Sequence, residues 1–440
     1  MVENPCVAFM FIFTAFVSLQ SLQSVLHSSG IGLVSLSCIY TSTVISCLFA
    51  PWLISKITTK WTIVAAFAVI TAYFGANFFS SHFVLIPFGI LMGLMAGPLW
   101  SAQATYITTL SITYAKHMQM DECDSMINKF MGLFYGCYRS SQIWGNLIST
   151  VVLHSNVSYG NLFDNTTYTR HCGASQCDIH SNELSNFDIV VPDSTKYMLL
   201  TIFLACGIMA IVIICVLLDN TEIVKTDFES ELNLTNSDTL ISTLNMLKDP
   251  KCLLLIPLVL FVGLEQGFVF GDFTKSYVNC TLGVNGIGPL LVCFGTVSSI
   301  SSLVIGFISK HIKRFAFIIA AAIFNIGLLI VLWLWRPLPI DIPNFYVIAG
   351  CLGLCDAIWQ TQTYTLFGVL FAHKQEAAFS SYRMFHATGC AVAFGYSYFL
   401  CVETKVYIMA AVLAIALSLY SIIEIKLQIY NRQLKEIVAL

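Results

Sequence analysis

Twelve long apolar segments constrain this chain more than any other feature of its sequence. A helix that crosses a bilayer needs about 20 mostly apolar residues. Because lipid cannot pair with an exposed backbone, such segments are expected to form helices. The sequence therefore predicts an all-α integral membrane protein with transmembrane helices at residues 6–27, 31–54, 61–80, 83–110, 129–153, 196–218, 252–273, 288–308, 315–335, 344–370, 379–400 and 405–427.

The composition agrees with a chain whose main solvent is lipid. Hydrophobic residues make up 57% of the 440 residues and charged residues only 10%, whereas soluble domains contain about 25% charged residues. A net charge of −3 gives no sign of the clustered basic surface that binds nucleic acid. Most of the 16 cysteines fall in apolar segments, where a free cysteine acts as a small hydrophobe. The expected partner is the bilayer, with no nucleic acid.

The distribution of Lys and Arg predicts which helix ends face the cytoplasm, because cytoplasmic loops carry an excess of both. With both termini inside, 15 of these residues fall on the inner side and 5 on the outer side, while Arg139 lies within a helix. The inner set is Lys56, Lys60, Lys116, Lys129, Lys225, Lys248, Lys251, Lys310, Lys313, Arg314, Lys374, Arg383, Lys426, Arg432 and Lys435. The outer set is Arg170, Lys196, Lys275, Arg336 and Lys405. We expect a multi-pass protein of the plasma membrane with cytoplasmic termini.

A long polar loop at about 154–195 is expected on the outer side. It contains glycosylation sequons at Asn156 and Asn165, and a third sequon at Asn279 follows the seventh helix. Cys172 and Cys177 stand in the same loop, as CGASQC. A second cysteine pair for a zinc site is missing, so we expect these two to close a small disulfide loop in an oxidising compartment.

Short matches between the two parts of the chain indicate an internal duplication. LISKITTKWT at 53–62 and FISKHIKRFA at 307–316 share their pattern at a spacing of 254 residues (308 − 54) and end the second and eighth segments. Trp100 and Gln103 in the fourth segment match Trp359 and Gln362 in the tenth. Parallel six-helix repeats describe the major facilitator architecture. We expect two pseudo-symmetric six-helix halves, 1–218 and 252–440 with a short cytoplasmic tail, joined by a polar cytoplasmic linker at 219–251.

The chain also resembles the uncoordinated-93-like family, nearest to its homologue A group. The resemblance runs from the first to the twelfth helix and is carried by SLQSLQSVLH, GPLWSAQATYIT, WGNLIS, CGASQC, SYVNCTLG, DAIWQTQ, EAAFSSYR and AFGYSYFLCV. It implies the major facilitator fold. It also implies a role as a regulatory partner of two-pore-domain potassium channels, whereas another branch of the family escorts receptors to endosomes.

Charged residues inside predicted membrane helices suggest further sites, because each costs at least ~2.5–3.5 kcal/mol to insert. Arg139, Glu265 and Asp356 lie within helices, and Asp272 lies near the outer end of the seventh. Arg139 and Glu265 differ in depth by roughly 6 Å at 1.5 Å per residue. We expect them to form an ion pair between the halves; the alternative is that each meets water or the interface separately.

Other polar side chains of the fourth and tenth helices are candidates for a central polar cavity. Asp356 precedes Trp359 and Gln362, and Trp100 and Gln103 occupy the matching helix. The alternative for the glutamines is hydrogen bonding between packed helices, at under about 1–2 kcal/mol each. No enzyme motif, metal site or cofactor site is recognised.

Two classes of function remain, an accessory subunit and a secondary transporter. Transporters of this fold commonly place an acidic residue and a glycine in the loop after the second helix, where this chain has Ser55 and Thr58 beside Lys56 and Lys60. The fourth helix carries no charge. These differences favour an accessory partner of a potassium channel with little or no transport of its own. A solute transporter working by alternating access, or a trafficking escort located in endosomes, are the alternatives.

Overall fold

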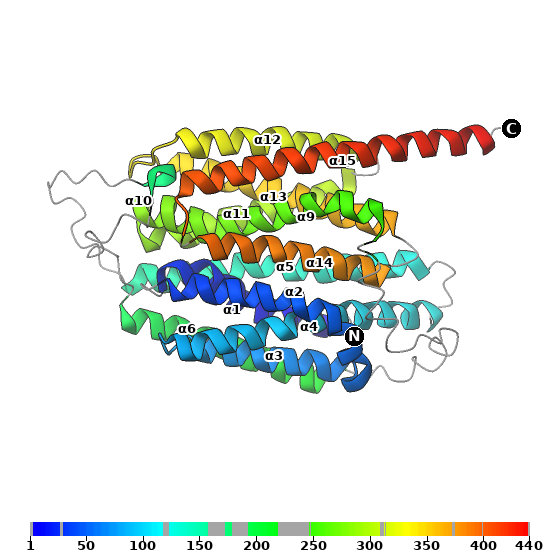
Figure 1. Ribbon diagram of the computed structural model, residues 1–440. Helices are drawn as coiled ribbons and strands as arrows, with labels where there is room; N and C mark the ends of the chain where they lie inside the picture. Colours follow the sequence, from blue (N-terminus) through cyan, green and yellow to red (C-terminus); the bar gives the residue numbers. More distant parts are fainter. Residues whose placement is uncertain are drawn as a thin grey trace.

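Twelve long helical segments make up the described part of the chain, as predicted for an all-α fold (Figure 1). The computed structural model describes residues 3–26, 30–117, 123–156, 172–177, 192–218, 246, 248–308, 312, 314–371, 375–397 and 399–438. The first six helices are α1 (Glu3–Leu26), α2 (Ile31–Ile57), α3 (Thr59–Ala76), α4 (His82–His117), α5 (Cys123–Asn156) and α6 (Asp193–Leu217). The others are α9 (Pro250–Phe268), continued by the π-helix η5 (Val269–Asn279) and α10 (Cys280–Leu282), then α11 (Val284–Ile308), α12 (Arg314–Leu334), α13 (Ile342–Leu370), α14 (Gln375–Tyr396) and α15 (Val402–Val438).

Ten of these helical segments are long and apolar enough to cross a bilayer. The other two, α5 and α14, are more polar and carry Arg139 and Arg383. Both pack against helices of the opposite half, α5 on α11 and α14 on α2. The protein shields part of their surface from lipid, so these two helices need fewer apolar residues than the others.

Equivalent glycines let α5 and α14 approach a neighbour in their own half. A Cβ added at Gly145 of α5 would collide with the backbone carbonyl of Thr14 in α1. A Cβ added at Gly389 of α14 would collide with the carbonyl of Leu260 in α9. Because α1 and α9 each begin a half, these matching contacts support the duplication seen in the sequence.

The repeated basic stretches lie at equivalent corners of the bundle. The first spans the end of α2 and the start of α3, with Lys56 exposed in the last turn of α2. In the second, α11 ends at Ile308 and α12 starts at Arg314. The Arg314 guanidinium lies 3.9 Å from the Glu424 carboxylate of α15, which ties this corner to the last helix. Residues 309–311 and 313, with Lys310 among them, lie outside the described residues.

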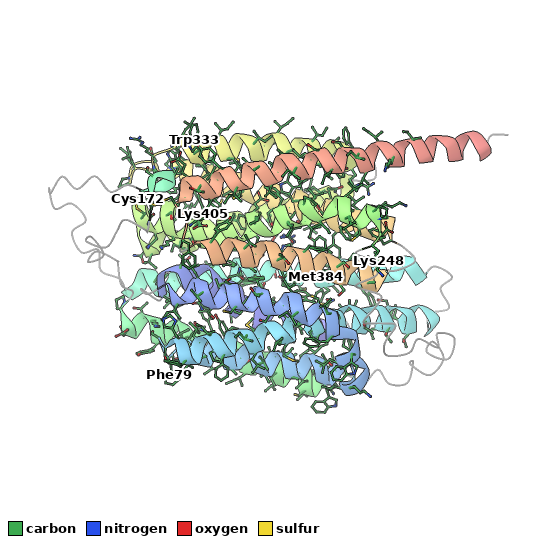
Figure 2. The ribbon with its side chains drawn as sticks, viewed as in Figure 1. Phe79, Cys172, Lys248, Trp333, Met384 and Lys405 are labelled. Atoms are coloured by element: carbon green, nitrogen blue, oxygen red, sulfur yellow. A yellow bond between two sulfur atoms is a disulfide. The ribbon has the colours of Figure 1, made fainter. Side chains whose placement is uncertain are left out.

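The two chain termini lie at the same end of the bundle, and α10 lies at the opposite end (Figure 1). Figure 2 labels Cys172 and Lys405 at the end that holds α10, away from the C-terminus. The last helix, α15, extends beyond the other helices at the end with the termini. The two termini lie at the same end because an even number of long helices crosses the bundle.

The cysteines of CGASQC pair with the second half rather than with each other. The structure contains the disulfides Cys172–Cys280 and Cys177–Cys401, so the predicted Cys172–Cys177 pair is wrong. Between the two cysteines, the 3₁₀ turn η1 (Gly173–Ser175) packs on α12, α15 and η5. The amide N–H of Val402 also donates to the Gln176 carbonyl at 3.2 Å. Residues 172–177 therefore pack against the second half, which places Cys172 beside Cys280 of α10 and Cys177 beside Cys401, just before α15.

This connectivity predicts the peptides that a digest should contain. Under non-reducing conditions, mass spectrometry is expected to find the Cys172 peptide joined to that of Cys280, and the Cys177 peptide joined to that of Cys401. In the Cys401→Ser variant, Cys177 should become accessible to a thiol reagent while the Cys172–Cys280 peptide persists. A peptide closed by Cys172 and Cys177 in the folded wild-type protein would contradict the structure.

The predicted glycosylation sites remain predictions. Asn165 lies outside the described residues, and so does the linker at 219–245. Asn156 is the last residue of α5, at the end of the bundle that holds the disulfides. Asn279 ends η5 beside the disulfide-bonded Cys280, and its Oδ1 atom is buried without a hydrogen-bond partner in the described part of the chain.

Candidate functional site

A charge cluster at the centre of the bundle joins the two halves. We define the central charge cluster as Arg139 of α5, Ser298 of α11, and Asp356 and Gln360 of α13. Arg139 Nη1 lies 3.3 Å from Asp356 Oδ2 and donates to Ser298 Oγ at 2.9 Å. Arg139 Nη2 donates to Gln360 Oε1 at 2.9 Å. The Arg139 and Asp356 side chains are 17% and 9% exposed, so the pair is largely removed from solvent.

Local helix geometry explains why this cluster forms. Asp356 and Gln360 are four residues apart and so lie on one face of α13. Gln360 Nε2 donates to Asp356 Oδ1 at 2.6 Å, and Ser298 Oγ donates to Asp356 Oδ2 at 2.9 Å. Both carboxylate oxygens are therefore paired before any ligand is considered. Since α11 and α13 belong to the second half and α5 to the first, the cluster also links the halves.

The predicted pair between Arg139 and Glu265 is wrong. Glu265 of α9 accepts a short hydrogen bond from Asn325 of α12, both in the second half. Its side chain is buried, and Arg139 pairs with Asp356 instead. The prediction compared depths along the helix axes. It could not include the rotation of each helix about its axis, which turns Glu265 toward α12.

A second group of side chains combines an arginine with aromatic rings. It lies at the interface between the two six-helix halves, which we call the half-interface. We define the arginine–aromatic cluster as Arg383 of α14, Trp100 of α4, Tyr364 of α13, and Tyr135 and Tyr138 of α5. The Arg383 guanidinium lies 4.3 Å from the Trp100 ring centroid and 6.0 Å from that of Tyr364. Tyr135 Oη donates to Tyr364 Oη at 3.1 Å, and Trp100 meets the Tyr138 ring edge-on at 5.1 Å.

Arg383 is a residue that the sequence analysis assigned to the cytoplasmic side rather than to the interior of a helix. It was counted among the cytoplasmic basic residues, but it lies within α14, stacked on a helix of the other half. A signal was available in the duplication. Tyr138, Arg139 and Gly145 recur as Tyr382, Arg383 and Gly389, each 244 residues later (383 − 139). Arg383 is thus the pseudo-symmetric counterpart of Arg139.

The remaining predicted cavity residues lie in different surroundings. Trp359 is fully buried, packs edge-on against Phe261 of α9 at 5.6 Å, and leaves its indole N–H without a partner among the described residues. Gln103 and Gln362 are also buried. Trp100, in contrast, is only partly buried and contacts Arg383. The matching tryptophans therefore separate into one at the half-interface and one inside its own half.

Asp272 has a partner that the sequence reading did not assign. Lys405 Nζ of α15 lies 2.7 Å from Asp272 Oδ1, and both side chains are 2% exposed. Ser397 Oγ donates to the same carboxylate oxygen at 2.6 Å, and Lys405 Nζ also donates to the Ser397 carbonyl at 2.8 Å. Asp272 lies on the π-helix η5, a rare form often found at functional sites. This pair joins the seventh and twelfth membrane helices near the disulfides.

Within the described ranges, no group of three or more His, Cys, Asp or Glu side chains is placed to hold a metal ion. The two clusters at the half-interface are therefore the main candidate site. Their chemistry is that of guanidinium groups, one carboxylate, amides and tyrosine hydroxyls. Such groups can bind a charged or polar molecule, or they can hold the halves together.

Comparison of the sequence with known families finds one that spans most of the chain. Residues 23–420 match the family described as "Ion channel regulatory protein UNC-93". Protein unc-93 homolog A of Xenopus laevis is 40% identical over 422 residues, covering 94% of this chain and 91% of the relative. The putative potassium channel regulatory protein unc-93 of Caenorhabditis elegans is 30% identical over 397 residues, covering 88% of this chain and 55% of the relative.

Comparison of the structure identifies the fold. The nucleoside transporter NupG superposes with a TM-score of 0.61 over 96% of this chain and 98% of the transporter. The two sequences are only 13% identical, so this likeness concerns the fold alone. The major facilitator fold, with two pseudo-symmetric six-helix halves, is the one predicted from the sequence.

Proposed function

Because the chain belongs to the UNC-93 family, we propose that it acts as a regulatory partner of a potassium channel, with little or no transport of its own. The observation that carries this proposal is the match to the family of ion channel regulatory proteins over residues 23–420. The C. elegans relative, whose name specifies a potassium channel, aligns with 88% of this chain. We further propose a channel of the two-pore-domain type, as the resemblance to the family implies.

The contacts at the half-interface favour a protein whose two halves remain packed together. Alternating access requires the halves to rock against each other around a central site. Here such a movement would have to separate Arg139 from Asp356, Arg383 from Trp100, and Tyr135 from Tyr364. A further bond, from Ser380 Oγ to the Cys47 carbonyl at 3.0 Å, joins α14 to α2. These contacts favour a rigid unit that presents its outer helices to a partner.

The outer helices offer apolar surface for such a partner. Exposed apolar side chains include Val216 of α6, Ile323 of α12 and Val347 of α13, which are 73%, 65% and 63% exposed. In a bilayer, these side chains contact lipid or the membrane helices of another protein. A channel subunit with membrane helices is a partner that this surface can accommodate.

We propose that the end with the disulfides faces the outside and that both termini are cytoplasmic. Disulfides form and persist in oxidising compartments, and Cys172–Cys280 and Cys177–Cys401 both lie at the end opposite the termini. The plasma membrane is the expected location for a partner of a potassium channel. An endosomal location is the alternative and would accompany an escort function.

Solute transport is a second candidate function, because the chain has the fold of known transporters and an ionised pair between its halves. Under this alternative, Asp356 would take part in coupling to an ion, and its separation from Arg139 would be a step of the transport cycle. Uptake of solute into proteoliposomes that is lost in the Asp356→Asn variant would support a transporter and contradict the accessory role.

Potassium current at constant channel abundance tests the proposed function. We expect expression of this chain with a two-pore-domain channel to change the open probability about fivefold or more, since coupling between regulatory sites is typically 5–150-fold. Surface biotinylation in the same cells measures the amount of channel. A change in surface abundance without a change in current per channel would indicate an escort instead. No change in either quantity across the two-pore-domain channels tested would contradict the proposal.

A further inference from the structure

Arg383 is a cation at the half-interface that lacks the acidic partner its counterpart has. Arg139 pairs with Asp356 and bonds Ser298 and Gln360. The Arg383 guanidinium instead lies over the Trp100 ring, 4.3 Å from its centroid, and 6.0 Å from the centroid of Tyr364. Among the residues that the structure describes, no carboxylate lies within ion-pair distance of its guanidinium. A guanidinium has five N–H donors, and stacking on a ring uses none of them.

The duplication explains why the acidic partner is missing. Trp100 and Trp359 are 259 residues apart (359 − 100), and the same spacing places Gly97 at the position that corresponds to Asp356 (356 − 259). In the second half, this position supplies the carboxylate for Arg139. In the first half, α4 packs closely on α2 at Gly97, whose amide N–H donates to Ser46 Oγ at 3.0 Å. The first half therefore has no carboxylate at this position for Arg383.

The surroundings of Arg383 suit an anion with an apolar part. Its side chain is only partly buried. The Tyr364 ring centroid lies 6.0 Å from its guanidinium, and the Tyr364 hydroxyl accepts a hydrogen bond from Tyr135. While the face of the guanidinium stacks on Trp100, its edge can donate two parallel hydrogen bonds to a carboxylate. The tyrosine rings provide apolar contact, and their hydroxyls provide further donors.

We propose that the arginine–aromatic cluster binds a small organic monocarboxylate, with the carboxylate on the edge of the Arg383 guanidinium. The ligand supplies the acidic group that Asp356 supplies to Arg139 in the other half. Two arginines close to the site disfavour an organic cation, and the aromatic walls favour a carboxylate attached to a ring or hydrocarbon group over an inorganic anion. The bound ligand contacts both halves and so stabilises their closed arrangement.

Benzoate binding to the purified full-length protein in lipid nanodiscs tests this proposal. Benzoate has the proposed carboxylate and ring, and benzamide is a neutral molecule of the same shape. In a buffer of low chloride, we expect benzoate to raise the temperature of thermal unfolding in a saturable manner and benzamide to have little effect. The Arg383→Gln variant should bind benzoate about tenfold more weakly or worse, as expected for loss of charged hydrogen bonds.

Two further variants separate a binding role from a structural one. Arg383→Lys keeps the positive charge but loses the paired donors, so it should also bind benzoate more weakly. Arg314→Gln removes an arginine at the start of α12 and should leave the affinity unchanged. Equal affinity in wild type, Arg383→Lys and Arg383→Gln would overturn the proposal, as would equal stabilisation by benzamide or by chloride. The absence of saturable benzoate binding to the wild type would do the same, and would leave the channel-regulator proposal untouched.

Discussion

The Lys405→Met variant is expected to unfold with about 3–5 kcal/mol less free energy than the wild type, the usual cost of removing one partner of a buried ion pair. Lys405 and Asp272 are both 2% exposed and only 2.7 Å apart. With the ammonium group gone, the Asp272 carboxylate keeps a bond from Ser397 but loses the cation that lies 2.7 Å from it. The loss should appear as a lower midpoint in thermal or denaturant unfolding in detergent micelles.

A matched control and a double variant make this prediction specific. Lys56 is exposed in the last turn of α2, so Lys56→Met should change the stability by less than about 0.5 kcal/mol. The double variant Asp272→Asn with Lys405→Met removes both charges and should recover part of the loss. If Lys405→Met is as stable as Lys56→Met, the buried pair does not exist in the folded protein.

Replacing Asp356 by Asn is the second change with a large expected effect, about 3 kcal/mol of unfolding free energy. This figure is at the lower end of the range because Arg139 is 17% exposed and keeps some contact with solvent. The substitution leaves Arg139 without its carboxylate at the half-interface. We also expect the halves to separate more often, which accessibility of an introduced cysteine on the inner face of α5 would report.

A double-mutant cycle tests which acidic residue Arg139 contacts. Arg139→Gln combined with Asp356→Asn should show a coupling energy of about 1–3 kcal/mol, as expected for side chains in contact. Arg139→Gln combined with Glu265→Gln should show a clearly smaller coupling, because Glu265 bonds Asn325. The reverse order of these two couplings would restore the Arg139–Glu265 pair predicted from the sequence.

Membrane-spanning helices, and the correspondence between repeated positions, could be predicted from the sequence. Hydrogen bonds within a helix join residues only three or four positions apart, and the number of consecutive apolar residues predicts a membrane span. For this reason the all-α membrane fold was predicted correctly. The correspondence of Arg139 with Arg383 was also present in the sequence, as the shared Tyr-Arg pair and later glycine.

Partners across the bundle were not accessible in this way. Whether Arg139 pairs with Glu265 or with Asp356 depends on how α5, α9 and α13 are rotated about their axes. Hydropathy gives little information about this rotation where all faces of a helix are apolar. Cys172 and Cys177 are near in sequence, yet η1 docks on the second half and brings them to Cys280 and Cys401. Proximity in sequence favoured the wrong disulfide because the docking energy comes from tertiary contacts.

The sequence by itself determined that this chain spans a membrane many times, as two related halves, because transfer of apolar side chains into lipid depends on composition and length. The tertiary structure alone decided which charges neutralise each other. An ion pair needs its atoms within about 4 Å, and that distance depends on the packing of helices from different parts of the chain. For Arg139 the packing supplies Asp356. For Arg383 it supplies aromatic rings and no carboxylate among the described residues, because the corresponding position in α4 is Gly97.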